Sequence, residues 1–187
     1  MARPPLYDDA LRDRLLDAAA RAVDAKGPER ISLRDVAQDA GTSTSAVYAL
    51  FGGKAELLVA VIEHGFSSFG ASQAEVPQGD LRALGLAYRE WAIGNAALYR
   101  LMFGGAIIAV DDCTADAATT SAAMAPLVGT LATRVPEAEV MAAALTVWAQ
   151  VHGAVSLELA GVAPEVVDWD SVYERVVDAV ERAFPAV

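Results

Sequence analysis

The sequence predicts an all-α protein of about nine helices. Alanine is abundant and β-branched residues rarely alternate with polar residues, which favours helices over strands. Apolar residues instead recur at spacings of three and four, as they do on the buried side of a helix. The hydrophobic fraction is 55%, so a chain of 187 residues can bury a substantial core and disorder is not expected.

The first predicted helix begins at Asp8 or Asp9 and ends at Ala25. Its apolar stripe consists of Leu11, Leu15, Ala18, Ala19, Ala22 and Val23. The two aspartates suit the positive end of the helix dipole, and the sequence Lys-Gly-Pro at 26–28 ends the helix.

Two short helices separated by a tight turn are predicted next. Ser32 begins a capping-box pattern, and Gly41 ends the helix that Ser32 caps. Ser43 is expected to N-cap the following helix, which the pair Gly52-Gly53 ends. Two helices of about two turns each, joined by a turn that contains glycine, are the pattern of a helix-turn-helix.

A longer helix is expected from Lys54 to about Ser68. Residues 70–79, which are rich in Ser, Gln, Pro and Gly, are expected to form a loop between domains. Further helices are predicted over 80–95, 96–104, 114–134, 137–161 and 169–184. The predicted organisation is a helix-turn-helix domain over 1–53, a connecting helix over 54–68 and a second helical domain over 69–187.

The net charge of −11 argues against non-specific binding of nucleic acid by the whole molecule. The first 65 residues hold eight Lys/Arg against ten Asp/Glu, whereas residues 66–187 hold six against fifteen. Only the N-terminal third can therefore form a local cationic face. The single cysteine, Cys113, fits a reducing compartment, and no secretory signal or long apolar span is found, so a soluble cytoplasmic protein is expected.

Several residues of the helix-turn-helix segment stand at fixed spacings. They are Val-Ala-x-x-Ala-Gly at 36–41, Ser43, Tyr48, Phe51, and Lys54 followed by Glu-Leu-Leu at 56–58. This pattern resembles the DNA-binding region of the tetracycline-repressor (TetR) family. Farther along, Trp148-x-x-x-His152-Gly153 followed by Leu157-Glu158, with Tyr-Arg-Leu-Met-Phe at 99–103, resembles the ligand-binding domain that is called the WHG type in this family.

In a helix-turn-helix the second helix lies in the major groove, with its N-terminal end towards the bases. The resemblance implies phosphate contacts for Tyr48 and Lys54. The expected DNA contacts together are Arg34, Ser43, Thr44, Ser45, Tyr48 and Lys54. The second helix carries no Arg, Lys, Asn or Gln, so it is expected to read thymine methyl groups and DNA shape. Alternatively, Tyr48 is a half-buried core aromatic, and Lys54 and Arg34 are ordinary surface residues.

The resemblance also implies a homodimer that binds a pseudo-palindromic operator in double-stranded DNA. The dimer surface is expected on the last two helices, and its candidate residues are Val151, Val155, Val172, Tyr173, Val176 and Val180. The helix at 137–161 is apolar nearly all round, which requires burial on more than one side, and Gly153 permits a close helix crossing. The alternative is that these residues form an ordinary core within one chain.

Bulky apolar residues with a few polar tips predict a pocket for a small-molecule effector. They are Trp91, Tyr99, Met102, Phe103, Met124, Trp148 and His152. Each of the seven can instead be a core residue, because a helical domain of this size needs such side chains. No cofactor is expected, and two histidines and one cysteine, widely separated, do not form a metal-binding pattern.

The residues and the resemblance together predict a ligand-responsive transcriptional regulator, a repressor that a small molecule releases from its operator. No Ser/His/Asp set, paired carboxylates or phosphate-binding loop is recognised, so an enzyme is not expected. An all-α enzyme and a helical scaffold whose helix-turn-helix contacts protein are the alternatives. Specific, salt-sensitive binding to a palindromic duplex separates the regulator from both.

Overall fold

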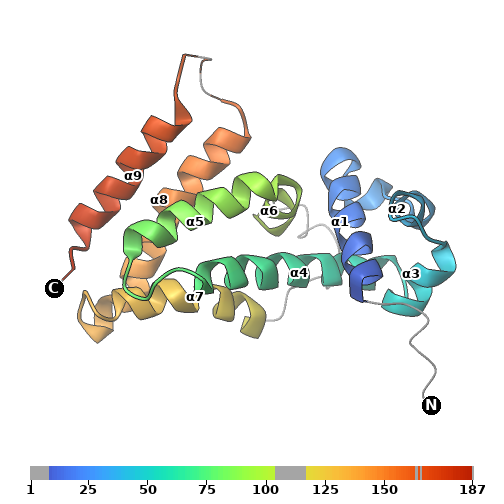
Figure 1. Cartoon of the computed structure of the whole chain (residues 1–187), viewed down its shortest axis with the longest axis horizontal. Helices are drawn as coiled ribbons and strands as arrows, with labels where there is room; N and C mark the ends of the chain where they lie inside the picture. The colour runs from blue at the N-terminus through green and yellow to red at the C-terminus, as the bar shows by residue number, and fades with distance from the viewer. Residues whose placement is uncertain (1–8, 104–116, 163, 165, 187) are drawn as a thin grey trace. The chain divides into compact units, whose positions relative to one another are not determined.

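The computed structural model describes residues 9–103, 117–162, 164 and 166–186 (Figure 1). Within these residues the chain forms nine α-helices and two 3-10 helices, with no strand. They are α1 (Asp9–Lys26), η1 (Pro28–Arg30), α2 (Leu33–Asp39), α3 (Thr44–Phe51), α4 (Lys54–Ala74), α5 (Leu81–Gly94), α6 (Ala96–Phe103), α7 (Ala117–Leu131), η2 (Glu137–Glu139), α8 (Val140–Leu159) and α9 (Trp169–Ala183). The predicted all-α fold is confirmed, whereas Cys113 lies outside the described residues.

The chain divides into two compact units. Unit 1 comprises Met1–Phe66 and Ala97–Thr119, and unit 2 comprises Ser67–Ala96 and Thr120–Val187. The helix α4 therefore contributes its first part to unit 1 and its last part to unit 2. The domain boundaries that the sequence suggested, at residues 53 and 69, stay predictions.

Unit 1 is built around α1, whose Leu15 and Leu16 are fully buried. α2 packs against α1, and α3 packs against α2. Ser32 caps α2 by accepting a hydrogen bond from the Asp35 N–H at 3.4 Å, as the capping-box pattern predicts. Gly41 adopts a φ of +71° directly after α2, a conformation that glycine tolerates better than any other residue. The turn into α3 therefore follows from local sequence.

The helix α4 is longer than the sequence predicts, because it continues to Ala74. The predicted loop over residues 70–79 is therefore wrong for its first half. Phe69 and Gln73 are buried in unit 2. The missing side chain of Gly70 lets α7 approach, since a Cβ atom there would lie 3.4 Å from the Ala123 Cα atom. The small residues of this segment serve helix packing and not a turn.

Unit 2 contains a close contact between α5 and α9. Gly85 lies at this contact, because a Cβ atom on it would come within 3.2 Å of the Val177 Cγ2 atom. The buried Tyr173 hydroxyl donates to the Gly85 carbonyl oxygen at 2.7 Å. The position of α9 against α5 is therefore set by a residue without a side chain and by one buried hydrogen bond.

Two arginines hold the middle and the C-terminal end of α9 against the rest of unit 2. Arg82 of α5 pairs with Glu174 and Asp178. Arg134, whose side chain is only 5% exposed, donates to the Phe184 carbonyl oxygen at 2.7 Å just beyond α9. Because the last carbonyl groups of a helix lack partners within the helix, this bond satisfies one of them. α9 is thus held along its length.

Replacing Gly85 by Val is expected to lower the free energy of unfolding by about 2 kcal/mol, because the new side chain meets Val177 in a packed contact. Gly129 of α7 is the matched control, since nothing lies within 4 Å of a Cβ atom built there. Urea unfolding followed by circular dichroism measures both variants. An equal loss of stability in Gly85→Val and Gly129→Val would contradict the assigned role of Gly85.

Candidate functional site

The outer face of α3 is exposed and carries short side chains. Ala46, Val47 and Phe51 are buried and hold α3 in unit 1. On the other side Ser45 is exposed, and Tyr48 is 58% exposed. This exposure argues against the alternative that Tyr48 is a half-buried core aromatic. The helix presents one side to the core of unit 1 and the other to solvent.

Ser43 occupies the N-cap position of α3, as predicted, but its side chain makes no capping hydrogen bond. Its backbone is extended, with φ −104° and ψ 157°, as is usual for an N-cap residue. Thr44 follows and is partly buried, whereas Ser43 and Ser45 are exposed. The first turn of α3 therefore directs two exposed hydroxyl groups towards solvent.

Lys54 begins α4 and is held in place by unit 1 itself. Its Nζ atom donates to the carbonyl oxygen of Glu29 in η1 at 2.7 Å. An ammonium group has three N–H donors, so this bond leaves two for other acceptors. Lys54 is therefore a positioned cation at the start of a helix, where the dipole also favours anions.

The carboxylates of α2 are neutralised by α1. Asp35 pairs with Lys26 at 3.1 Å, and Asp39 pairs with Arg21 at 2.7 Å. Arg34 of the same helix is exposed and makes no ion pair within the described part of the chain. Exposed pairs of this kind add little stability, but they offset negative charge that a phosphate backbone would otherwise meet.

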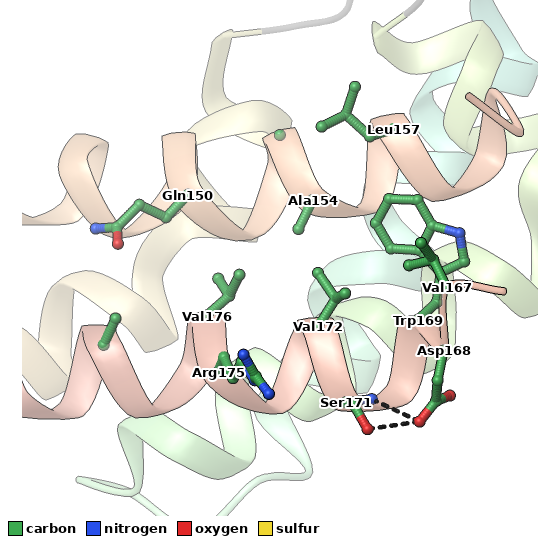
Figure 2. A pocket seen from close by; sticks show the side chains of 12 residues that line it. Gln150, Ala154, Leu157, Val167, Asp168, Trp169, Ser171, Val172, Arg175 and Val176 are labelled. Carbon is green, nitrogen blue, oxygen red and sulfur yellow. Dashed lines mark hydrogen bonds between the residues drawn. The ribbon is translucent and has the colours of Figure 1, made fainter. Parts of the chain in front are cut away.

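Most of the predicted interface residues are buried inside unit 2. Those with 4% exposure or less are Val151, Val155, Tyr173 and Val180. They pack in the core of unit 2, as the alternative of an ordinary core within one chain expects. An apolar stripe at helical spacing marks burial but does not say against which partner. Val172 and Val176 are partly exposed, and both line a groove between α8 and α9 (Figure 2).

The groove between α8 and α9 is open and mostly apolar. Leu157 of α8 and Trp169 of α9 contribute its largest apolar side chains (Figure 2). Gly153 also lines it, and no atom lies within 4 Å of a Cβ atom built on that glycine. Among the residues that the structure describes, the groove is lined by one cation, Arg175, and one carboxylate, Asp168.

The outer side of α8 exposes further apolar side chains. Met141 is 57% exposed and Leu145 is 49% exposed. By length and composition the helical segment Glu137–Leu159 is also long and apolar enough to cross a membrane. Its inner side is packed in unit 2, however, where Val147 and Val155 are buried. The segment is therefore a core helix with one uncovered apolar side.

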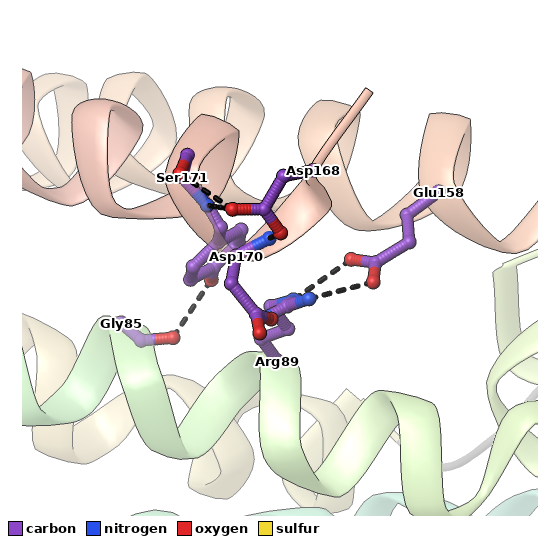
Figure 3. A network of polar contacts seen from close by, with 7 residues as sticks. Gly85, Arg89, Glu158, Asp168, Asp170 and Ser171 are labelled. Carbon is purple, nitrogen blue, oxygen red and sulfur yellow. Dashed lines mark hydrogen bonds and ion pairs between the residues drawn. The ribbon is translucent and has the colours of Figure 1, made fainter. Parts of the chain in front are cut away.

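Arg89 of α5 bridges the last turn of α8 and the first turn of α9 (Figure 3). Its guanidinium donates to both carboxylate oxygens of Glu158, at 2.7 and 2.8 Å, and pairs with Asp170 at 2.7 Å. It also lies 5.3 Å from the centroid of the Tyr173 ring. The hydrogen bond with Glu158 is the main reason why the pKa of Arg89 lies above its ordinary value. Arg89 thus fixes the end of the groove where α8 connects to α9.

Asp168 caps α9 at the same end. Its carboxylate accepts hydrogen bonds from the Ser171 hydroxyl and from the backbone N–H groups of Asp170 and Ser171, the latter two at 3.2 and 3.3 Å. The Ser171 hydroxyl, followed by these N–H groups, holds the pKa of Asp168 below its ordinary value. Asp168 therefore stays ionised on the wall of the groove.

The seven predicted effector residues are divided between the two units. Unit 1 contains Tyr99, Met102 and Phe103, and unit 2 contains Trp91, Met124, Trp148 and His152. In unit 1 the Tyr99 and Phe103 rings contact each other, with centroids 5.1 Å apart. In unit 2 Met124 packs against an apolar cluster that includes Leu81, which makes it a core residue. The remaining three belong to an aromatic cluster.

This cluster forms around Tyr88, a residue that is not among the sequence candidates. The Trp148 Nε1–H donates to the Tyr88 hydroxyl at 3.3 Å, and this hydroxyl lies 2.9 Å from His152 Nδ1. Phe69 packs edge-on against both Tyr88 and Trp91, with centroids 5.3 Å away in each case. Burial lowers the pKa of His152. The spacing of Tyr88 and Trp91, three residues apart on one helix, was the available signal for including Tyr88.

Two family models match the chain. The family described as bacterial regulatory proteins, tetR family, matches residues 15–61. The family described as tetracyclin repressor-like, C-terminal domain, matches residues 81–180, which is more than half of the chain. The first match includes α2 and α3, and the second runs from α5 into α9.

The HTH-type transcriptional repressor DrrR1 of Streptomyces coeruleorubidus is 35% identical over 88 residues, a match that spans 47% of this chain but only 31% of that protein's length. The solved structure of SCO4313 gives a TM-score of 0.75 at 25% identity, over 91% of this chain and 94% of that one. The transcriptional regulator FadR from Bacillus subtilis, solved in complex with stearoyl-CoA, gives 0.71 at 13% identity, over 90% and 97%. The helix-turn-helix, the all-α fold and these matches agree: the chain belongs to the tetracycline-repressor family.

Proposed function

We propose that this protein is a ligand-responsive DNA-binding transcriptional regulator, a repressor that a small molecule releases from a pseudo-palindromic operator. The observation that carries the proposal is the exposed side of α3, where Ser43, Ser45 and Tyr48 project from a helix packed on its other side. Family membership supports the same function, and one relative, DrrR1, is a transcriptional repressor.

In the proposed complex α3 enters the major groove with its N-terminal end towards the bases. The short side chains of Ser45 and Ala49 allow a close approach to base edges and thymine methyl groups. The Tyr48 hydroxyl and the Lys54 ammonium contact phosphates, which position the helix without specifying a sequence. Arg34 adds a third polar contact from α2. Specificity then depends largely on methyl groups and DNA shape.

The uncovered side of α8 supports a homodimer. Met141, Leu145, Gly153 and Leu157 stand at multiples of four residues along one side of α8, and the three larger ones are each about half exposed. Monomeric proteins seldom leave a continuous apolar surface of this kind in water. A second copy that covers it forms a two-fold dimer, which places two α3 helices about one DNA turn apart, roughly 34–36 Å.

The proposed effector site lies beside Trp148, Tyr88 and His152. The Trp148 N–H donates to the Tyr88 hydroxyl oxygen, which lies 2.9 Å from His152 Nδ1. These polar groups stand beside apolar rings, which suits an effector with both a polar and an apolar part. FadR, which shares the fold, is solved with stearoyl-CoA, so the fold can hold a molecule with a long apolar chain.

Regulation in this proposal is a two-state equilibrium without a catalytic step. The effector binds more tightly to a conformation of the dimer in which the two α3 helices no longer match the operator spacing. A coupling free energy of about 1–3 kcal/mol between the two sites gives sizeable regulation. The proposed place of action is the cytoplasm, where the DNA is.

Combining Tyr48→Phe with Lys54→Ala is expected to weaken binding to a duplex selected from a random pool by about 10- to 100-fold at physiological salt, because two phosphate contacts are lost. The slope of log affinity against log salt concentration is expected to fall by about 1 for the lysine. Fluorescence anisotropy of a labelled duplex measures both quantities.

Arg182→Ala is the control, because it also removes one positive charge but from α9 in unit 2, where the side chain is exposed. Its affinity for the same duplex is expected to stay close to that of the wild type. If the double variant binds as tightly as the wild type, Tyr48 and Lys54 are not the phosphate contacts.

The stability of the protein is expected to depend on His152 below neutral pH. Burial lowers the pKa of His152 in the folded state, so the folded chain binds fewer protons than the unfolded chain, whose histidine titrates near 6.5. The contribution of neutral His152 to the free energy of unfolding is therefore complete above about pH 6.5. It is lost as the pH falls from there towards the pKa of His152 in the folded state. Urea unfolding between pH 5 and 8 measures it, and His152→Gln is expected to remove this part of the slope.

His64→Gln, the same substitution at the only other histidine, is the control for removing an imidazole. The pH dependence of the free energy of unfolding is compared between the wild type and His152→Gln. If the two are the same, the hydrogen bond between Tyr88 and a neutral His152 does not contribute to stability.

A further inference from the structure

The guanidinium of Arg12 in α1 lies over the ring of Phe51, the last residue of α3. Its Cζ atom is 5.2 Å from the ring centroid. An aromatic ring attracts a cation over its face, so this contact restricts a long side chain that would otherwise sample many rotamers. Both residues belong to unit 1. α1 thus places a cation at the C-terminal end of the helix that the proposed function assigns to the major groove.

Phe51 is midway in the sequence between the two proposed phosphate contacts. Tyr48 precedes it by three residues on α3, so the two side chains are neighbours on the helix surface. Lys54 follows it by three residues, which limits the distance between their Cα atoms to about 11 Å. The phosphates of one DNA strand recur every ~3.4 Å along the duplex axis. Donors of α1, α3 and α4 near this ring are therefore close enough together to contact one short run of phosphates.

Covering the Phe51 ring does not by itself require a charged side chain. An apolar residue would cover it as well, whereas Arg12 is partly buried and brings a cation with it. The ring attracts the guanidinium as a whole, and a guanidinium has five N–H donors, so the contact leaves donors for an oxygen acceptor. Two of these donors can bind two oxygens of one phosphate. Because the ring already restricts the side chain, less entropy is lost when it binds.

We propose that Arg12 is a further phosphate contact of the DNA complex and that Phe51 is the residue that positions it. This inference rests on the DNA binding of the proposed function. α1, α3 and α4 then form one surface of unit 1 for the DNA backbone, with Arg12, Tyr48 and Lys54 as its donors. Phosphate contacts orient the protein on the duplex and do not distinguish between base sequences.

The first test replaces Arg12 by Met, which removes the charge and keeps an unbranched side chain that can cover the ring. Arg12→Met is expected to weaken binding to a duplex selected from a random pool by about 10-fold at physiological salt. The slope of log affinity against log salt concentration is expected to fall by about 1 per bound chain. Arg12→Lys keeps the charge and is expected to restore this slope. Fluorescence anisotropy at several salt concentrations measures all three proteins.

Arg14→Met is the matched control, because it makes the same change on the same helix. Arg14 is exposed, and two residues correspond to about 200° around a helix, so its side chain lies on the other side of α1 from Arg12. Its affinity and its salt slope are expected to stay close to those of the wild type. Circular dichroism checks that each variant is folded.

Phe51→Leu tests the positioning role, since it keeps an apolar side chain in the core and removes the ring. It is expected to weaken binding by about 3-fold in the wild-type background without changing the salt slope. In the Arg12→Met background it is expected to have no further effect, because the side chain that the ring positions is then absent. Equal losses in both backgrounds would overturn the positioning of Arg12 by Phe51.

The outcomes separate this inference from the proposed function. If the wild type binds no duplex specifically, the proposed function itself fails. If the wild type binds and Tyr48→Phe with Lys54→Ala weakens it, but Arg12→Met binds as Arg14→Met does, DNA binding stands and the contact by Arg12 is overturned. An affinity loss in Arg12→Met with an unchanged salt slope would likewise overturn the phosphate contact, because the role of Arg12 would then be structural.

Discussion

The geometry of unit 2 depends most on the ion pairs of the Arg89 guanidinium. It joins the last turn of α8, the first turn of α9 and the side of α5 in one partly buried network. Breaking a buried pair leaves an uncompensated charge and costs about 3–5 kcal/mol, whereas a fully exposed pair contributes about 0–1 kcal/mol. Glu158, with a side chain 14% exposed, is near the first case. Together with the Gly85 contact and the Tyr173 hydrogen bond, this network holds α9 against α5 and α8.

Unit 1 contains the helix-turn-helix of a chain whose net charge is −11, and DNA phosphates repel negative charge. The carboxylates of α2 are paired with cations of α1, and the Lys54 ammonium is held by the Glu29 carbonyl oxygen, so unit 1 keeps one cation in a fixed position at the start of α4. In the proposed complex, few phosphate contacts give modest affinity, which a homodimer raises by presenting two such surfaces to one duplex. DNA binding in this proposal depends on dimerisation as well as on α3.

Local signals in the sequence were sufficient for the helix-turn-helix, because the Ser32 cap, Gly41 and the Gly52-Gly53 break act on the backbone nearby. They failed for α4, since the burial of Phe69 and Gln73 depends on distant residues. Tyr173 and Val180 were assigned to a surface for the same reason: a stripe at helical spacing marks burial but does not say against which partner. The spacing of Tyr88 and Trp91 places both on one helix, but no local pattern shows that Tyr88 contacts Trp148 and His152. These two residues lie 60 and 64 positions away in the sequence.

A two-fold dimer that reads DNA through α3 has to recognise two half-sites at once. Selection of bound duplexes from a random pool by the wild-type protein is expected to enrich an inverted repeat whose half-site centres lie about one helical turn apart, roughly 34–36 Å, bound by two chains and weakened by salt. Recovery of no common sequence, or of a single half-site bound by one chain, would contradict it.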